Sequence, residues 1–320
     1  MLDVFVTMRL PEKTLQRLTD NGLKFDVWTG ESSIPPDIFL ERVRGVKGII
    51  CRLSDRIDST LLNAADLKAL KSRGVRVGYT PEMLTEATAE LTVSLLLSVS
   101  RRIVEASAAV KDGSWGTWEP FWMCGKGLEH STVGILGLGR IGKAVATRLA
   151  SFSPGYIIFT SSGRPETSSH PVLLYTKPDG TQVLAEPVSF DDLLRRSDFL
   201  CVCCAFSEKT RGLFTDAVFD QMKPGAVFVN VSRGAMVDQD ALYRALSKPS
   251  GGLGGAGLDV MSPEPLPTDS PLLSLPHCVV LPHIGSATTA TRWKMAERTV
   301  DNLLAGLADP PMPLPSELRF

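Results

Sequence analysis

The chain has 320 residues, of which 43% are hydrophobic and 22% are charged, and its formal net charge at pH 7 is −1. This length and composition favour two ordinary globular domains, each able to bury a hydrophobic core. The near-zero charge argues against a nucleic-acid partner or an anionic membrane surface, and no apolar run reaches the length of a membrane span.

The first residues, MLDVFVTMRLPEK, lack the basic-then-apolar pattern of a signal peptide and are expected to form a strand followed by a helix. Three of the six cysteines lie in the apolar run at residues 198–206, DFLCVCCAF, which is typical of a buried parallel strand. Cys201 and Cys204 stand at CxxC spacing inside this apolar run, and no second cysteine or histidine pair completes a zinc-ligand pattern. We therefore expect a reduced, cytoplasmic protein without a metal site.

Short apolar runs at residues 3–8, 24–30, 47–54 and 74–80 predict the strands of a first, smaller domain. Residues 81–115 then show apolar positions at helical spacing, which predicts one long helix that links two domains. A last helix, over residues 289–308, can return to the first domain. This first domain is thus expected to be discontinuous, comprising residues 1–82 and 288–320.

From residue 131 onward, apolar runs alternate with helical patterns, as in STVGILGLG (131–139) followed by RIGKAVATRLASF (140–152). This alternation predicts an α/β fold with a parallel sheet covered on both faces, a doubly wound sheet, in a second domain over residues 83–287. Residues 161–183 are rich in turn-forming residues and are expected to leave the sheet as a solvent-side excursion.

The hexapeptide at residues 137–142, GLGRIG, fits the pattern GxGxxG between an apolar strand and an amphipathic helix. In this context Gly137 permits a tight turn, Gly139 lets the backbone approach a pyrophosphate, and Gly142 lets helix and strand pack closely. The helix N-terminus adds N–H donors and the positive end of a dipole. The motif therefore predicts a dinucleotide site.

The residues after the second strand of this domain indicate which dinucleotide binds. An NAD site usually has an acidic residue there to hold the ribose 2′-hydroxyl, whereas this chain reads FTSSGR at residues 159–164. Ser161, Ser162 and Arg164 could donate to a 2′-phosphate. We expect NADP(H) to be preferred and NAD(H) to be possible; the alternative is an ordinary polar loop.

Three further residues follow predicted strands at the edge where open α/β sheets bind ligands, namely Arg233, Glu264 and His283. Taken singly, they could be a surface ion pair, a solvated turn and a structural hydrogen-bonding group. Together they suit one reaction. Arg233 can hold a carboxylate and polarise a keto oxygen, His283 can protonate that oxygen, and Glu264 can favour the charged imidazole. Asp259 is a candidate for contact with the amide or ribose side of a nicotinamide.

Four segments, TVGILGLGRIG, VNVSRGAMVDQDAL, AGLDVMSPEPLP and LPHIGSAT, resemble the successive motifs of the D-isomer-specific 2-hydroxyacid dehydrogenases, and most closely their glyoxylate reductase/hydroxypyruvate reductase branch. The resemblance covers nearly the whole chain. It implies two Rossmann-like domains with an active site between them, a homodimer, and NADP(H)-dependent reduction of glyoxylate and hydroxypyruvate to glycolate and D-glycerate. It also implies the catalytic roles of Arg233, Glu264 and His283. The implied cofactor contacts are Gly139, Arg140, Ile141, Ser162, Gly163, Arg164, Pro165, Ala205, Val231 and Gly285.

Substrate contacts are expected from Leu53 and Ser54 at a strand end, from Arg233 and His283, and from Ser286. The aromatic stretch at residues 115–122 resembles the arm by which dimers of this family embrace. Trp118 in this stretch could reach the partner's substrate pocket, or the stretch could serve packing alone.

The chain departs from the family in one place. Relatives carry an additional strand ending in a Val-Gly-x-Asp loop whose backbone N–H groups hold the substrate carboxylate, and no such tetrapeptide occurs between Leu53 and Tyr79. Loss of oriented donors predicts weak or absent turnover with preserved cofactor affinity. The alternatives to a fully active reductase are a catalytically weak NADP(H)-binding isoform and a corepressor-like nucleotide sensor that acts through protein contacts.

Overall fold

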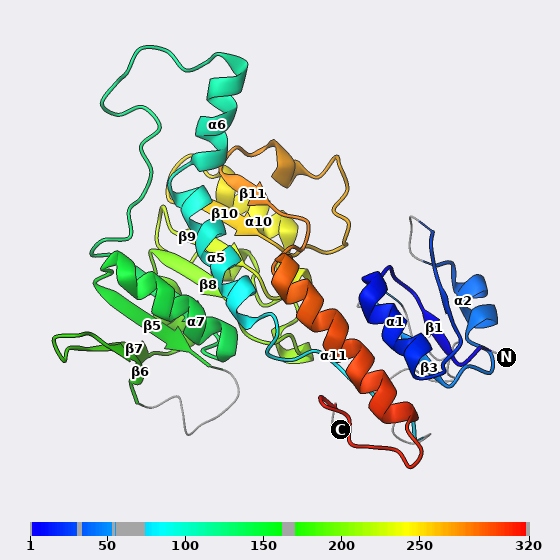
Figure 1. Cartoon of the computed structure of the whole chain (residues 1–320). Coiled ribbons are helices and arrows are strands. Elements are labelled where there is room, and N and C mark those ends of the chain that lie inside the picture. Colours follow the sequence, from blue (N-terminus) through cyan, green and yellow to red (C-terminus); the bar gives the residue numbers. More distant parts are fainter. Residues whose placement is uncertain (1, 31–33, 53–54, 56–73, 162–169, 318–320) are drawn as a thin grey trace. The chain divides into compact units, whose positions relative to one another are not determined.

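A computed structural model describes residues 2–30, 34–52, 55, 74–161 and 170–317 (Figure 1). The chain divides into two compact units. Residues 1–84 and 287–320 form the first unit, and residues 85–286 form the second. The sequence placed these limits at residues 82/83 and 287/288.

The first unit contains a parallel sheet in the order β2-β1-β3, built from β1 (Val4–Val6), β2 (Phe25–Val27) and β3 (Gly48–Ile50). The helices among its described residues are α1 (Glu12–Asp20), α2 (Pro36–Arg42) and α11 (Thr289–Leu307). The last helix packs against both α1 and β3. A Cβ on Gly48 would lie within 3.0 Å of the Leu303 side chain, so this glycine lets α11 approach the sheet closely. The C-terminal helix therefore closes a discontinuous unit.

The fourth strand expected over residues 74–80 is reduced, in the described part of the chain, to one antiparallel bridge between Gly78 and Glu317. The Asn302 side chain reinforces this contact, since its amide donates to the Tyr79 carbonyl at 3.0 Å and its oxygen accepts from Ser316 N–H at 2.9 Å. The expected loss of a strand falls on residues 53–54 and 56–73, which lie outside the described residues.

The expectation of one long helix over residues 81–115 is wrong. The segment forms α5 (Thr85–Ser100) and α6 (Ile103–Asp112), separated at Arg102, whose φ of 53° is left-handed. A left-handed residue interrupts the helical hydrogen bonds and changes the chain direction. Arg102 donates to both carboxylate oxygens of Glu105, which secures the start of α6.

The second unit is built on an eight-stranded sheet in the order β11-β10-β9-β8-β4-β5-β7-β6. Every neighbouring pair that joins β11 to β7 is parallel. The strands are β4 (Thr132–Leu136), β5 (Tyr156–Thr160), β6 (Val172–Thr176), β7 (Gln182–Pro187), β8 (Phe199–Val202), β9 (Val227–Asn230), β10 (Gly255–Leu258) and β11 (Cys278–Val280). The α/β fold with parallel sheets in two Rossmann-like domains is thereby confirmed.

Helices cover both faces of this sheet. On one face lie α5 and α7 (Arg140–Leu149), and on the other lie α8 (Phe190–Arg196), α9 (Asp216–Phe219) and α10 (Gln239–Ser247) (Figure 1). The side chains of β8 alternate between two buried clusters, with Phe199 and Cys201 in one and Leu200 and Val202 in the other. This alternation explains why the strand is apolar at every position.

The expectation that residues 161–183 leave the sheet is wrong for their second half. Strands β6 and β7 form an antiparallel hairpin that extends the sheet beyond β5. Leu174 is buried whereas Leu173 is 42% exposed, which is the alternation of a strand with one covered face. The tight turn contains Gly180 at φ 85°.

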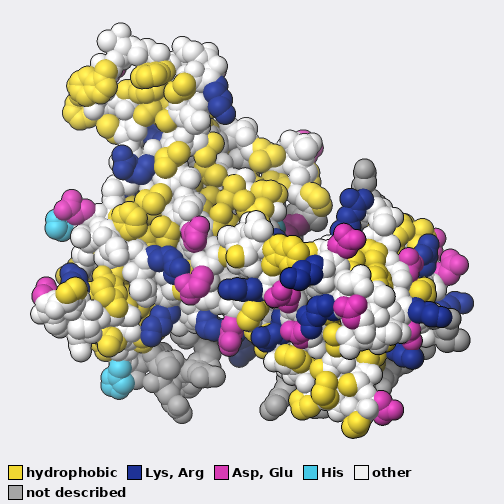
Figure 2. Space-filling model, viewed as in Figure 1, with side chains coloured by type: hydrophobic (Ala, Val, Ile, Leu, Met, Phe, Trp, Pro, Cys, Tyr) yellow, Lys and Arg dark blue, Asp and Glu magenta, His cyan; other side chains and the backbone are white. Residues whose placement is uncertain are grey.

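Large apolar side chains gather without cover on α6 and on the following loop (Figure 2). Trp118 is 79% exposed and Phe121 is 89% exposed, and Trp115 and Val110 are also exposed. A contiguous surface of this kind is unusual for a monomer and is typical of an interface. No helix within the described residues is long and apolar enough to cross a membrane.

Candidate functional site

The GxGxxG loop connects β4 to α7, and its three glycines differ in what surrounds them. A Cβ on Gly137, whose φ is 94°, would lie closer than 3.0 Å to the backbone of Cys204, and one on Gly142 would lie equally close to the carbonyl oxygen of Gly137. A Cβ on Gly139 would have nothing within 4 Å. The outer glycines are thus required by the fold, whereas the middle glycine borders open space.

That open space adjoins the N-terminus of α7. Gly139 is the N-cap and provides no side-chain cap, and no acidic residue lies in the first helical turn. The N–H groups of a helix N-terminus and the helix dipole favour an anion at this position. The loop also lies between β5 and β8, where the strand order reverses direction and dinucleotides bind in such sheets. The residues present therefore fit the diphosphate of a nicotinamide dinucleotide.

The remaining predicted cofactor residues follow neighbouring strands. Ser161 follows β5 and is half-buried, Ala205 follows β8 and is exposed, and Val231 follows β9 and is 8% exposed. Arg140 and Ile141 open α7. Of the residues expected to hold a 2′-phosphate, Ser162 and Arg164 lie outside the described residues, as do the implied cofactor contacts Gly163 and Pro165.

Arg233 lies just beyond β9 in a turn that a buried asparagine holds in shape. The Asn230 amide donates to the Arg233 carbonyl at 3.1 Å, and its oxygen accepts from Ser232 N–H at 3.0 Å. Ser232 Oγ donates to the Cys204 carbonyl. Arg233 Nη1 donates to the Ser232 carbonyl at 2.7 Å, and the residue is exposed. The turn thus presents a cation at the carboxyl edge of the sheet.

Glu264 and His283 form a directly bonded pair. His283 Nδ1 lies 2.8 Å from Glu264 Oε2, and the second carboxylate oxygen accepts from Met261 N–H at 3.0 Å. The His283 and Glu264 side chains are 40% and 35% exposed, respectively. Because a carboxylate only accepts hydrogen bonds, the imidazole donates through Nδ1 and leaves Nε2 for another partner.

Asp259 fixes the loop that carries His283. Its side chain is buried, and its two oxygens accept from Ile284 N–H at 2.7 Å and from Gly285 N–H at 2.8 Å. Burial raises the pKa of Asp259, although these two N–H groups act in the opposite direction. His283 has a left-handed φ of 54°, and its N–H donates to the Leu281 carbonyl. Contact of Asp259 with a nicotinamide stays a prediction; the bonds that the structure gives it are to this loop.

The turn of Arg233 and the turn of Glu264 also touch each other. A Cβ on Gly234 would lie closer than 3.0 Å to the backbone of Met261, whose N–H binds Glu264. A continuous path of contacts therefore runs from the Arg233 turn through Met261 to Glu264 and His283. All of these residues follow the adjacent strands β9, β10 and β11.

Other predicted substrate contacts are placed as follows. Leu53 and Ser54 lie outside the described residues. Ser286 is half-buried at the end of the second unit, and Trp118 is exposed in the loop after α6. Asn230 was not predicted from the sequence, although an asparagine that ends an apolar strand before Val-Ser-Arg was a possible signal.

The chain is similar to several known proteins. Residues 93–285 match the family described as D-isomer specific 2-hydroxyacid dehydrogenase, NAD binding domain. The chain is 45% identical, over 341 aligned residues, to a glyoxylate reductase/hydroxypyruvate reductase of Homo sapiens, and the alignment covers 100% of this chain and 98% of the human protein. Since this alignment is longer than the chain, the human protein has residues without a counterpart here.

Two solved structures resemble the whole chain. The TT0316 protein of Thermus thermophilus has a TM-score of 0.87 and 38% identity, with 99% of each chain covered. An NADPH-dependent glyoxylate/hydroxypyruvate reductase of Sinorhizobium meliloti, in complex with NADP and malonate, has a TM-score of 0.77 and 27% identity, with 98% of this chain and 96% of that chain covered.

Proposed function

The chain belongs to the D-isomer specific 2-hydroxyacid dehydrogenase family, and from this premise we propose that it reduces glyoxylate and hydroxypyruvate to glycolate and D-glycerate with NADPH. The names of the human and Sinorhizobium meliloti relatives support these substrates. The observation that carries the proposal is the Glu264–His283 pair at the carboxyl edge of the sheet.

His283 is the proposed acid. With Nδ1 bound to Glu264, the ring can carry a proton on Nε2 only as the imidazolium, which the nearby carboxylate favours. Nε2–H then donates its proton to the keto oxygen of the substrate. A bound nicotinamide dinucleotide would supply the hydride to the keto carbon. In the reverse direction the neutral ring accepts the proton from the hydroxyl group.

Arg233 is the proposed substrate anchor. The Arg233 guanidinium has five N–H donors. Its Nη1 donates to the Ser232 carbonyl, and the remaining exposed N–H groups can pair with a substrate carboxylate. Asn230 and Gly234 keep this turn rigid, so the cation needs little rearrangement to bind.

The second unit, with the glycine loop, is the proposed dinucleotide domain, and the first unit, with α11, is the proposed substrate domain. The absence of an acidic residue between Phe159 and Arg164 supports NADP(H) over NAD(H). The Sinorhizobium meliloti relative in complex with NADP supports the same preference.

We propose a low turnover number. The Val-Gly-x-Asp tetrapeptide expected to hold the substrate carboxylate does not occur at residues 53–79, and the human relative has residues without a counterpart in this chain. Loss of a preorganised donor costs about 10²-fold in other enzymes. Dinucleotide binding depends on residues 137–142, and we expect it to be retained.

The test combines two measurements on the purified chain. NADPH and NADH affinities are measured by dinucleotide fluorescence, and NADPH oxidation is followed with glyoxylate and with hydroxypyruvate. We expect tighter binding of NADPH than of NADH, and slow turnover that depends on the 2-oxo acid. Equal affinities would refute the cofactor preference, and NADPH binding without any reduction of either acid would refute the activity.

The cysteines support a reducing compartment, and we propose the cytoplasm. All six lie within the described residues and none of them forms a disulfide, and burial raises the pKa of Cys201 and of Cys278 to about 12. These two thiols act as apolar core residues rather than as nucleophiles.

A further inference from the structure

We infer that Gln239 is a positioning residue for the acid–base pair: its side chain clamps the backbone of Ser262 and thereby orients Glu264 toward His283. This inference rests on the proposed function. Gln239 is neither in the glycine loop nor at a strand end, and it belongs to the first turn of α10.

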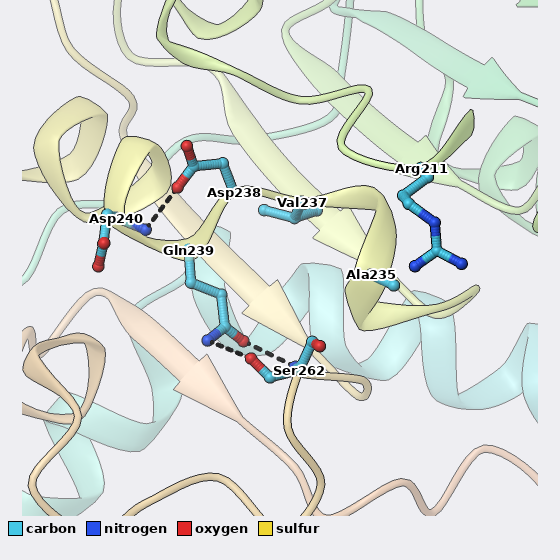
Figure 3. A pocket seen from close by; sticks show the side chains of 7 residues that line it. All are labelled: Arg211, Ala235, Val237, Asp238, Gln239, Asp240 and Ser262. Atoms are coloured by element: carbon cyan, nitrogen blue, oxygen red, sulfur yellow. Dashed lines mark hydrogen bonds between the residues drawn. The ribbon is translucent and has the colours of Figure 1, made fainter. Parts of the chain in front are cut away.

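The clamp consists of two hydrogen bonds to one residue (Figure 3). Gln239 Nε2 donates to the Ser262 carbonyl at 3.0 Å, and Ser262 N–H donates to Gln239 Oε1 at 3.0 Å. A primary amide can thus bind both backbone groups of one residue, much as a neighbouring strand would. Two bonds with opposite donor direction fix both the position and the orientation of the Ser262 backbone.

The clamped residue is next to the group that holds Glu264. Met261 N–H donates to Glu264 Oε1, and Glu264 Oε2 accepts from His283 Nδ1. The turn at residues 261–264 therefore has the Gln239 clamp on one side and the imidazole on the other. A shift of this turn moves the carboxylate relative to the ring.

The Gln239 amide has no competing charged partner among the other side chains drawn in Figure 3. Arg211 pairs with both oxygens of Glu208 at 2.9 Å, and Asp238 accepts from the N–H groups of Asp240 and Ala241 at the start of α10. The neutral Gln239 amide therefore makes both of its bonds to Ser262. Arg233 and Gln239 stand six residues apart, so one short segment carries both the proposed substrate anchor and the clamp on the turn of Glu264.

We expect loss of the clamp to lower the reaction rate more than the free energy of unfolding. Ser262 and Glu264 are exposed, and a hydrogen bond near water contributes little to unfolding free energy. The rate, in contrast, depends on the geometry of a proton donor to within about 1 Å.

The experiment compares Gln239→Met, which keeps side-chain length and removes both bonds, with Gln239→Glu, which keeps the acceptor for Ser262 N–H and loses the donor. Gln221→Met is the matched control, because Gln221 is an exposed glutamine of the same unit whose amide binds the Ala217 carbonyl at 3.1 Å, within its own turn. We expect Gln239→Met to lower kcat about tenfold to a hundredfold, with an unchanged dissociation constant for NADPH. Gln239→Glu should be intermediate, and Gln221→Met should match the unmodified chain.

A double-mutant cycle separates positioning from general structural damage. If Gln239 acts through Glu264, then Gln239→Met should cause little further loss of kcat in a Glu264→Gln background. An equal fold-loss of kcat in both backgrounds would overturn the inference.

A second readout does not require turnover. The chain has only four histidines, so the ¹⁵N signals of the His283 ring can be assigned with a His283→Asn variant. In the neutral ring of the unmodified chain, we expect the proton on Nδ1, bound to Glu264. Gln239→Met should shift the population toward the Nε2–H tautomer, and an unchanged tautomer would overturn the inference. Absence of glyoxylate reduction by the unmodified chain would instead refute the proposed function and leave this spectroscopic test valid.

Discussion

The two nitrogens of the His283 imidazole differ in their hydrogen bonding. Among the residues that the structure describes, only Nδ1 has a bonding partner on the protein. Glu264 holds Nδ1 at 2.8 Å and is itself held by Met261 N–H. Asp259 holds the following two N–H groups, which fixes the loop from the other side. Two carboxylates therefore orient the His283 ring. Glu264 contacts the ring, and Asp259 acts through the backbone of residues 284–285.

Glu264→Gln should lower kcat for glyoxylate reduction by roughly tenfold to a hundredfold, because a neutral amide no longer stabilises the imidazolium. The NADPH dissociation constant should not change. Glu129→Gln, at an exposed position of the same unit, is the control. Steady-state NADPH oxidation measures the effect, and an unchanged kcat would contradict the role given to Glu264.

The residues to which we assign a chemical role could be predicted from the sequence because they follow apolar strands, and parallel strands bring their ends to one edge. Arg233, Glu264 and His283 were predicted in this way. Asn230 and Gln239 were not, because the role proposed for each depends on a side-chain bond to backbone. The bond from Gln239 spans 23 residues and leaves no periodic signal in the sequence.

At the scale of elements, the glycines of the β4–α7 connection divide into two kinds. Gly142 is in contact with the loop backbone, whereas Gly139 faces open space at a helix N-terminus. The same motif therefore contains two glycines that the fold requires, Gly137 and Gly142, and one, Gly139, that we propose a ligand requires.

Gly139→Ala should leave the unfolding free energy nearly unchanged and weaken NADPH binding by about tenfold or more, because the methyl group displaces an anion from the N–H groups. Gly142→Ala should lower the unfolding free energy by about 1–3 kcal/mol, because the added methyl overlaps the Gly137 carbonyl. Urea denaturation and dinucleotide fluorescence measure the two quantities. The reverse pattern would contradict this division.

Asp198 links three segments of the second unit. It accepts from Lys126 Nζ at 2.8 Å, from Thr132 N–H at 2.9 Å and from Lys223 Nζ at 3.1 Å. Burial alone would raise the pKa of Asp198, but these bonds outweigh burial and the pKa is lowered. A lowered pKa in the folded state contributes stability above the ordinary aspartate pKa, and this stability is lost as the pH falls through the folded-state value.

Asp198→Asn should therefore lower the unfolding free energy at pH 7 by about 1–3 kcal/mol. The difference from the unmodified chain should shrink as the pH falls below about 4, where the unfolded chain binds its proton. Urea denaturation at several pH values measures it, with Asp269→Asn as an exposed control. A difference that is independent of pH would contradict the role of the charge.

The order of elements was predictable, whereas two interruptions were not. The periodicity of residues 81–115 continues through Arg102, and no glycine or proline marks the break between α5 and α6. The β6–β7 hairpin is short and rich in turn-forming residues, so its two strands were not predicted. One of them, β6, lies at the sheet edge. Tertiary packing determines both the break between α5 and α6 and the β6–β7 hairpin, and local propensity does not predict such packing.

On the surface of the molecule, exposed aromatic residues lie together in the loop after α6 (Figure 2). Trp118 and Phe121 would cost free energy in water, and burial of such side chains is a common driving force of association. We propose that this surface meets a second copy of the chain in a homodimer.

A double variant, Trp118→Ser with Phe121→Ser, should convert the dimer to a monomer in light scattering after size-exclusion chromatography. Trp293→Ser, at a less exposed tryptophan of α11, should stay dimeric. A monomeric unmodified chain, or a dimer that survives the double variant, would refute the assignment of this surface.

We propose that a dinucleotide held at residues 137–142 reduces a 2-oxo acid whose keto oxygen receives its proton from His283. The most direct test supplies NADPH deuterated at the transferred position together with glyoxylate, and measures deuterated glycolate by mass spectrometry, which detects slow turnover. We expect labelled glycolate from the unmodified chain, and a rate about 10²–10⁴-fold lower from His283→Asn at unchanged NADPH affinity. No labelled glycolate from a chain that binds NADPH, or an equal rate from His283→Asn, would contradict the claim.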